Sequence, residues 1–254
     1  MFFVLGQIVL GLLIPGVAAQ ELVWQEANGP HDVSVLLATP DGTLYAGTSR
    51  GAFRSDDSGD FWRRAGLANL KVRALAASGT MVYAGSDSGI FRSGNGGRSW
   101  TQVGLLARNV RSLVASGTTV YAGTWGTGAF CSTDNGGNWT GSNTGLTNRY
   151  ILSLALDGLT LYAGTALGGV FRSEDAGKSW RHVGLTNRYI LALATAGGIL
   201  YAGTDGGYVF RSADGGNSWT QVEVTFQDVT SLAVIGAKIY AGANGSGVFR
   251  SVDG

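Results

Sequence analysis

The chain has 254 residues, of which 42 are glycine and only 3 are proline, with 44% hydrophobic and 14% charged residues. This composition favours a turn-rich all-β protein, because helices use more Ala, Glu, Lys and Leu and far less Gly. The net charge of +1 predicts no nucleic-acid partner. The single cysteine, Cys131, excludes an intrachain disulfide and a Cys-based zinc site.

The N-terminus carries an apolar run over residues 2–14, which Pro15 and Gly16 end. The run is short for a membrane span, and the small residues 17–19 suit cleavage by a signal peptidase before Gln20. We expect a signal peptide at 1–19 and an exported mature chain, 20–254, that is secreted or periplasmic and has no membrane span. No Lys or Arg precedes the run, so a retained anchor and a misassigned start are the alternatives.

A motif of the form Ser-x-Asp-x-Gly-x-x-Trp recurs along the chain. Its serines lie 38 to 41 residues apart, which marks a repeat of about 39 residues. One further copy has Asn95 in place of the aspartate, and another begins at Ser251 and stops at Gly254. The complete copies are Ser55, Asp57, Gly59, Trp62; Ser132, Asp134, Gly136, Trp139; Ser173, Asp175, Gly177, Trp180; and Ser212, Asp214, Gly216, Trp219.

Each repeat predicts four short strands. The first is apolar, the second contains Tyr-Ala-Gly, the third ends in Phe-Arg-Ser, and the fourth begins at the motif tryptophan. Four strands in about 39 residues, joined by Gly, Asp and Ser turns, describe one propeller blade. We therefore predict an all-β, six-bladed β-propeller with blades at 33–66, 72–104, 110–141, 151–184, 190–223 and 229–254.

The last blade lacks a fourth strand and a motif tryptophan. Residues 22–26, which include Trp24, supply both at the other end of the chain. An N-terminal strand that completes blade six would close the ring and remove open sheet edges. The alternative is a fragment of a longer repeat array, since truncation also leaves a chain that ends inside a motif.

The repeated motif suits a structural turn. Its Asp and Ser oxygens can accept hydrogen bonds from turn N–H groups, its Gly supplies a positive φ, and its Trp buries a large apolar face. A feature present in every blade is also poor evidence for a single active site.

The motif resembles the Asp-box, or bacterial neuraminidase repeat, and the resemblance covers residues 22–254. That superfamily includes sialidases, xyloglucan-active glycosidases, sortilin-type receptors and the compact photosystem II assembly-factor group. The resemblance implies a propeller whose Asp-boxes lie at the periphery, away from the functional face. It indicates the fold far better than the activity.

The opposite face holds the residues that break the symmetry of the repeat. Arginine with aromatic side chains suits a planar anion, a sugar or an acidic segment of a partner. The alternative is a solvated rim copied by duplication, because GLTNRYIL occurs at both 145–152 and 184–191. The predicted binding face contains Arg73, Arg108, Arg111, Trp125, Arg149, Tyr150, Arg188 and Tyr189, beside Lys71.

An enzymatic role has little support in the sequence. A sialidase would show an Arg-Ile-Pro segment, and none of the three prolines follows Arg-Ile. A glycosidase of another type needs two carboxylates, and Asp32 and Asp228 occupy equivalent positions on blades one and six. We expect a non-catalytic scaffold that binds a protein or a glycan, without metal or cofactor. The alternatives are a two-carboxylate glycoside hydrolase and a lectin.

Overall fold

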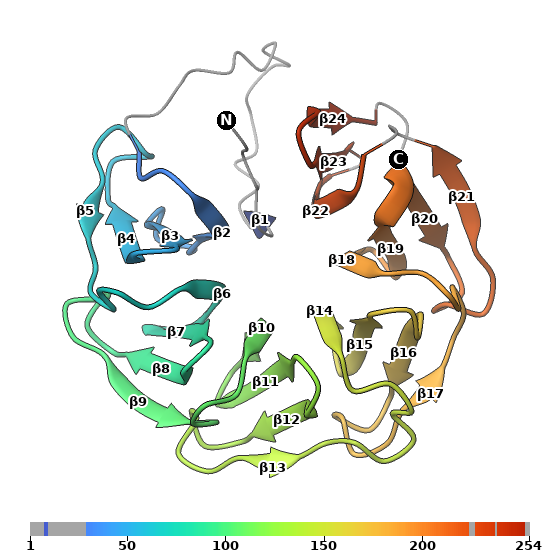
Figure 1. Ribbon diagram of the computed structural model, residues 1–254, viewed down its shortest axis with the longest axis horizontal. Coiled ribbons are helices and arrows are strands. Elements are labelled where there is room, and N and C mark those ends of the chain that lie inside the picture. Colours follow the sequence, from blue (N-terminus) through green and yellow to red (C-terminus); the bar gives the residue numbers. More distant parts are fainter. Residues whose placement is uncertain (1–7, 10–28, 224–226, 237, 252–254) are drawn as a thin grey trace.

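The computed structural model describes residues 8–9, 29–223, 227–236 and 238–251. Within them the chain forms six small sheets arranged in a ring around a central opening (Figure 1). The strands of each blade follow one another in chain order and pair antiparallel, with the first strand innermost. The predicted six-bladed β-propeller is confirmed. In the described part of the chain, no helix is long and apolar enough to cross a membrane.

The first three blades consist of twelve strands. They are β2 (Val33–Ala38), β3 (Leu44–Thr48), β4 (Gly51–Ser55) and β5 (Arg63–Arg64); β6 (Val72–Ser78), β7 (Met81–Ser86), β8 (Gly89–Ser93) and β9 (Thr101–Gly104); and β10 (Val110–Ser116), β11 (Thr119–Thr124), β12 (Gly128–Ser132) and β13 (Thr140–Gly141).

The last three blades follow the same plan. They are β14 (Ile151–Asp157), β15 (Thr160–Thr165), β16 (Val170–Ser173) and β17 (Arg181–His182); β18 (Ile190–Ala196), β19 (Ile199–Thr204), β20 (Tyr208–Ser212) and β21 (Thr220–Glu223), with a 3-10 turn η1 (Asp205–Gly207); and β22 (Val229–Ile235), β23 (Lys238–Ala243) and β24 (Gly247–Arg250). The fourth strand was predicted to start at the motif tryptophan, but it starts one residue later, because that side chain turns toward the neighbouring blade.

The N-terminal expectations fall mostly outside the described residues. Only β1 (Ile8–Val9) of the predicted signal peptide is described, and it pairs in parallel with β2 at the centre of the ring (Figure 1). The strand predicted at 22–26 lies outside the described residues. Gly29, which is described, lies 3.2 Å from the indole nitrogen of Trp62, measured from an added Cβ. In the same way, a Cβ added at Gly66, which follows the fourth strand of blade one, would lie 3.1 Å from the indole nitrogen of Trp100 in blade two. Gly29 therefore has the same position relative to blade one as Gly66 has relative to blade two.

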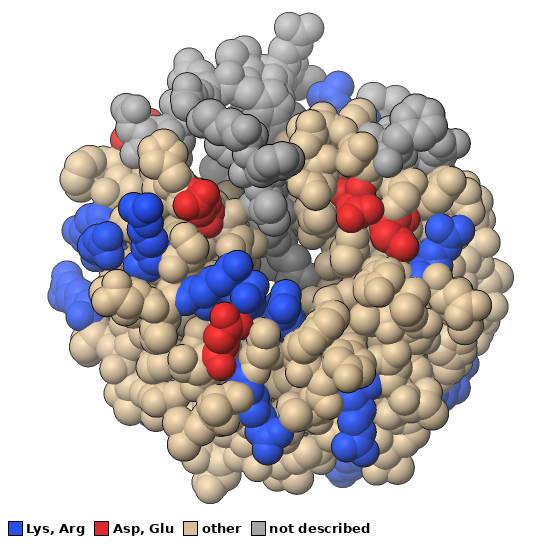
Figure 2. All heavy atoms as spheres, in the orientation of Figure 1, with Lys and Arg blue, Asp and Glu red and all other residues tan. Residues whose placement is uncertain are grey.

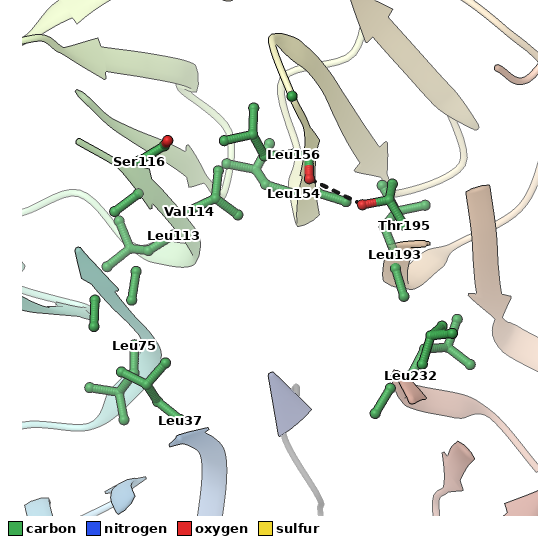
Figure 3. A pocket seen from close by; sticks show the side chains of 18 residues that line it. Leu37, Leu75, Leu113, Val114, Ser116, Leu154, Leu156, Leu193, Thr195 and Leu232 are labelled. Atoms are coloured by element: carbon green, nitrogen blue, oxygen red, sulfur yellow. Dashed lines mark hydrogen bonds between the residues drawn. The ribbon is translucent and has the colours of Figure 1, made fainter. Parts of the chain in front are cut away.

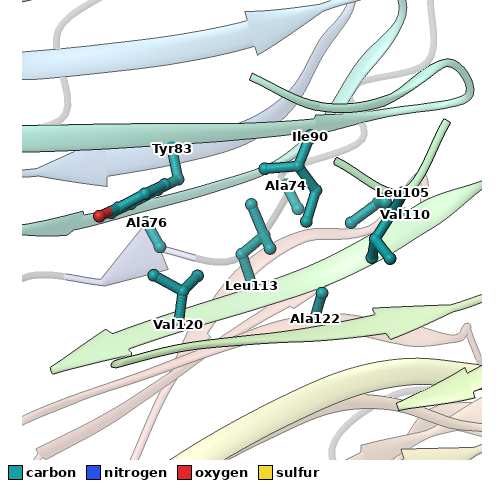
Figure 4. Close-up of a cluster of buried hydrophobic side chains, with 9 residues drawn as sticks. All are labelled: Ala74, Ala76, Tyr83, Ile90, Leu105, Val110, Leu113, Val120 and Ala122. Atoms are coloured by element: carbon teal, nitrogen blue, oxygen red, sulfur yellow. The ribbon is translucent and has the colours of Figure 1, made fainter. Parts of the chain in front are cut away.

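The hydrophobic core lies between blades rather than in one central mass. Figure 4 shows one such layer, in which Tyr83 and Ile90 of blade two pack against Val110, Leu113 and Val120 of blade three. All five side chains are buried. Clusters of this kind lie between consecutive blades from blade one to blade six, so removal of apolar surface from water holds these neighbours together.

The repeated motif forms a hydrogen-bonded turn between the third and fourth strands. In blade four, Ser173 Oγ donates to Asp175 Oδ1 (2.8 Å) and accepts the N–H of Gly177 (2.8 Å). Asp175 Oδ1 also accepts the N–H of Ser179 (2.8 Å). The same bonds recur in the other complete copies, and Asn95 accepts them in blade two.

The motif tryptophans join adjacent blades. The indole N–H of Trp180 donates to Ser142 O (2.8 Å) and that of Trp139 to Val103 O (3.0 Å), both in the preceding blade. Trp219 reaches Val183 O in the same way (2.8 Å). The turn thus uses its polar groups on itself and its indole on the neighbouring blade, which is a structural role.

These turns predict a loss of stability in acid. The N–H of Asn138 lowers the pKa of Asp134 to about 2, and the Ser179 hydroxyl lowers that of Asp175 to about 2, from 3.8. A lowered folded-state pKa stabilises the fold above pH 3.8, and this stability is lost as the pH falls toward 2. We expect the urea midpoint to fall between these pH values, and to fall less in the double variant Asp134→Asn/Asp175→Asn. Equal acid sensitivity of the two proteins would contradict this assignment.

Candidate binding face

The loops between second and third strands lie at the opposite end of each blade from the motif turns. In blade three, the N–H of Trp125 donates to Asn109 O (2.9 Å), and the N–H of Gly126 donates to Arg149 O (3.0 Å). Trp125 also forms an isolated antiparallel bridge with Tyr150. The loop is therefore fixed both to its own blade and to the next one.

Three of the predicted residues form one group, here called the Trp125 cluster: half-buried Arg111 and the exposed Trp125 and Tyr150. The two rings meet edge to face with centroids 5.1 Å apart, and the Arg111 guanidinium lies 5.1 Å from the Trp125 ring. Arg111 Nε also donates to Asn109 Oδ1 (3.0 Å). Trp125 is 40% and Tyr150 is 47% exposed, which leaves aromatic surface and a positive charge available together.

Arg73 lies beside this cluster but is paired. Its guanidinium donates to both carboxylate oxygens of Asp87, at 2.7 and 3.1 Å, and these bonds lower the pKa of Asp87. Burial, followed by the nearby charge of Arg73, lowers the pKa of Arg111. Figure 2 shows Lys and Arg side chains gathered beside the central opening over the blades of β6–β9 and β10–β13, with acidic side chains next to them.

The side chains of the remaining predicted residues are not part of the cluster. The Arg108 guanidinium lies 5.0 Å from the centre of the Phe130 ring, and that of Arg188 lies 5.2 Å from the centre of the Phe210 ring. Both phenylalanines belong to the third strand of the blade that follows the arginine. The backbone of Arg149 holds the Trp125 loop, whereas the backbone N–H of Tyr189 donates to Asp205 Oδ1 (3.2 Å). Sequence reasoning grouped these residues by repeat position, which cannot distinguish side chains near the opening from those over an outer strand.

The two carboxylates of the alternative catalytic site lie in different surroundings. Asp228 Oδ1 accepts the N–H of Gly206 (3.1 Å), and Asp228 O accepts that of Asn244 (2.9 Å), so this residue holds two loops. Asp32 is exposed and has φ +59°. No contact within the described ranges joins the two side chains.

The central opening contains a cavity of about 470 Å³. Its wall comes from the innermost strands, and Figure 3 shows Leu75, Leu113, Leu154 and Leu193 among the side chains that line it. Thr195 is one of the few polar groups there, and its hydroxyl donates to Leu156 O (3.1 Å). None of the described residues that line it is titratable, and the surface that they offer is largely apolar.

Comparisons with known proteins agree with the architecture. Residues 120–232, less than half of the chain, match the family model described as DUF6242 beta propeller domain. No curated protein matches the sequence significantly. The extracellular domain of the BT4673 system from B. thetaiotaomicron is similar, with a TM-score of 0.73 and 22% identity over 86% of this chain and 31% of that one.

Two other solved structures are similar. The GH74 xyloglucanase from Xanthomonas campestris has a TM-score of 0.71 and 20% identity over 90% of this chain and 45% of the enzyme. YCF48 bound to D1 peptide has a TM-score of 0.71 and 16% identity over 96% of this chain and 86% of YCF48. The chain thus spans less than half the length of two of these proteins. The comparisons confirm the predicted resemblance to this class of β-propeller, and at these identities they show the fold alone.

Proposed function

We propose that the chain is a non-catalytic β-propeller scaffold that binds an acidic peptide segment of a partner protein on the Trp125 cluster. The observation that carries this proposal is the contact of half-buried Arg111 with the exposed ring of Trp125, which meets the exposed ring of Tyr150 edge to face. Trp, Tyr and Arg are the residues in which binding energy concentrates at protein interfaces. Within the described ranges Arg111 has no carboxylate at ion-pair distance, so its charge is available to a partner.

The surroundings of the cluster support a peptide ligand. The loop that presents Trp125 is held by main-chain bonds to two blades, so little ordering is needed on binding. Tyr189, on the next blade, is 37% exposed and extends the aromatic surface. The peptide complex of YCF48 is a precedent for peptide binding by a propeller of this fold.

We expect the proposal to be tested by fluorescence anisotropy with a labelled poly-glutamate peptide. Trp125→Ala and Arg111→Ala should each weaken binding at least about tenfold, which corresponds to about 1.4 kcal/mol. A rise in salt concentration should weaken the binding of poly-glutamate to the unmodified protein, because salt screens exposed charges over about 10 Å at 0.1 M. The matched control is Arg98→Ala, an exposed arginine in a motif turn at the other end of blade two. If Arg98→Ala weakens binding as much as Arg111→Ala does, the loss reflects the net charge of the protein and not a specific contact at the Trp125 cluster.

A labelled heparin oligosaccharide separates the two partner classes left open by the sequence. If it binds through the same residues while poly-glutamate does not bind, the partner is an anionic glycan and the peptide proposal fails. If neither probe binds to folded protein, the Trp125 cluster is a solvated rim.

The alternative, a glycoside hydrolase, is favoured only by the similarity to GH74 enzymes. The use of Asp228 as a loop anchor supports a structural role for that carboxylate. We expect no turnover of xyloglucan or chromogenic glycosides by the full chain. Turnover that disappears in both Asp32→Asn and Asp228→Asn would replace the scaffold proposal by the hydrolase.

A further inference from the structure

In blades one and two, an arginine connects the third strand to the motif turn of the next blade. Arg54 Nη1 donates to Gly96 O (2.8 Å), and Arg92 Nη1 donates to Asn135 O (2.7 Å). The Arg54 guanidinium also lies 5.7 Å from the ring of Tyr45, on the adjacent strand of its blade. The Arg54 bridge therefore places a guanidinium between a tyrosine and a backbone carbonyl.

Blade three lacks this side chain because Cys131 occupies the arginine position. The two residues that an arginine would meet are still present: Tyr121 stands at the position of Tyr45, and Ala176 stands at the position of Gly96 and Asn135 in the next turn. Where an arginine side chain would lie between these two residues, there is a cavity of about 300 Å³, and Tyr121, Cys131 and Ala176 are among the residues that line it. This volume is at the lower end of the range for small-molecule sites, about 300–1,000 Å³.

The polar groups of this cavity match a planar cation. Tyr121 is only 6% exposed, and burial, followed by the neighbouring Cys131 thiol, raises the pKa of its hydroxyl. The carbonyl of Ala176 accepts no side-chain hydrogen bond within the described ranges, whereas the carbonyls of Gly96 and Asn135, two of its equivalents in the other turns, each accept an arginine. A bound guanidinium would satisfy that carbonyl and contact the Tyr121 ring.

Charge around the cavity is compatible with such a ligand. Asp134 lines it as a carboxylate, and Lys178 lines it as an exposed cation. Arg98 occupies the position of Lys178 in the blade-two turn, where Arg54 nevertheless forms its bridge. A cation at this position of the turn therefore does not prevent a guanidinium from binding the carbonyl.

We propose that the Cys131 cavity, between blades three and four, binds an alkylguanidinium group. The group can belong to an arginine side chain of a partner protein or to a free small molecule. The site is independent of the Trp125 cluster, because it lies at the motif-turn end of the blades.

The test follows the alkylation of Cys131 in the full chain by a small thiol reagent. Burial raises the pKa of the thiol, so the reaction is run at alkaline pH. With n-butylguanidinium at ten times its dissociation constant, alkylation should slow about tenfold, because only unliganded protein reacts. At the same concentration and ionic strength, n-butylammonium should give no comparable protection, because it lacks the planar fork of donors. Equal protection by the two cations, or none by either, overturns the proposal.

Two variants provide an independent readout by thermal unfolding. Cys131→Ser keeps the cavity and should retain the rise in Tm caused by n-butylguanidinium. Cys131→Arg should lose that rise, because its own side chain fills the site as Arg54 and Arg92 do in their blades. A rise that persists in Cys131→Arg places the ligand elsewhere and overturns the proposal. If this variant does not fold, the alkylation assay on the parent still decides.

The two sources of the guanidinium are separated by comparing agmatine with a blocked Gly-Arg-Gly peptide. Protection by both assigns the cavity to an arginine of a partner chain, because the peptide backbone is then accommodated at its mouth. Protection by agmatine alone assigns it to a free small molecule.

Discussion

Trp180→Ala is expected to lower the free energy of unfolding by about 3–5 kcal/mol, the usual cost of truncating a buried tryptophan. The side chain is only 5% exposed and packs in the cluster between blades three and four, against Tyr121 and Phe171. Its indole N–H donates to Ser142 O (2.8 Å), so truncation also leaves a buried carbonyl without that donor. Urea unfolding followed by circular dichroism measures the loss.

Two further variants separate packing from hydrogen bonding at this position. Trp180→Phe keeps most of the ring and should cost less than Trp180→Ala, because it chiefly removes the bond to Ser142. Phe61→Ala is the control for aromatic truncation, since Phe61 lies in a motif turn but is 68% exposed. It should change stability by no more than about 0.5 kcal/mol. A loss below this level in Trp180→Ala would contradict the structural role of the motif.

Gly123→Ala is expected to destabilise the fold by about 1–3 kcal/mol or more through overpacking. Gly123 ends the Tyr-Ala-Gly segment of blade three, where the inner strand of blade four approaches its backbone. A Cβ added here would lie 2.4 Å from Cγ2 of Ile151, which is itself fully buried. The glycine is thus required by the neighbouring blade and not by a turn.

A double-mutant cycle tests that cause. Ile151→Ala alone should cost about 2–5 kcal/mol, because it leaves a cavity in the core. The combined variant Gly123→Ala/Ile151→Ala should lose less than the sum of the single losses, since the added methyl enters space that Ile151 has left. Strict additivity would show that the cost of Gly123→Ala arises elsewhere. Gly158→Ala is a contrasting control, because its cost must come from its positive φ (59°) and no atom lies within 4 Å of the added Cβ.

The repeat made the fold predictable. The spacing of Ser173, Asp175, Gly177 and Trp180, repeated in the other blades, predicted the number of blades and the order of strands, because each blade repeats one local pattern. The start of the fourth strands was wrong by one residue, since contact of the tryptophan with the preceding blade takes it out of the strand.

The grouping of side chains was decided only by the tertiary structure. From the sequence, Arg108, Arg111 and Arg188 were equal members of one face, but packing over Phe130 and Phe210 draws two of them away and leaves Arg111 on Trp125. The position of Cys131 was visible in the sequence as a departure from Phe-Arg-Ser. The cavity that this departure leaves also depends on the next blade, at Ala176, 45 residues along the chain, because the packing of blade four against blade three brings these residues together. The repeat pattern was enough to predict the blade, whereas the two candidate sites depend on contacts between blades.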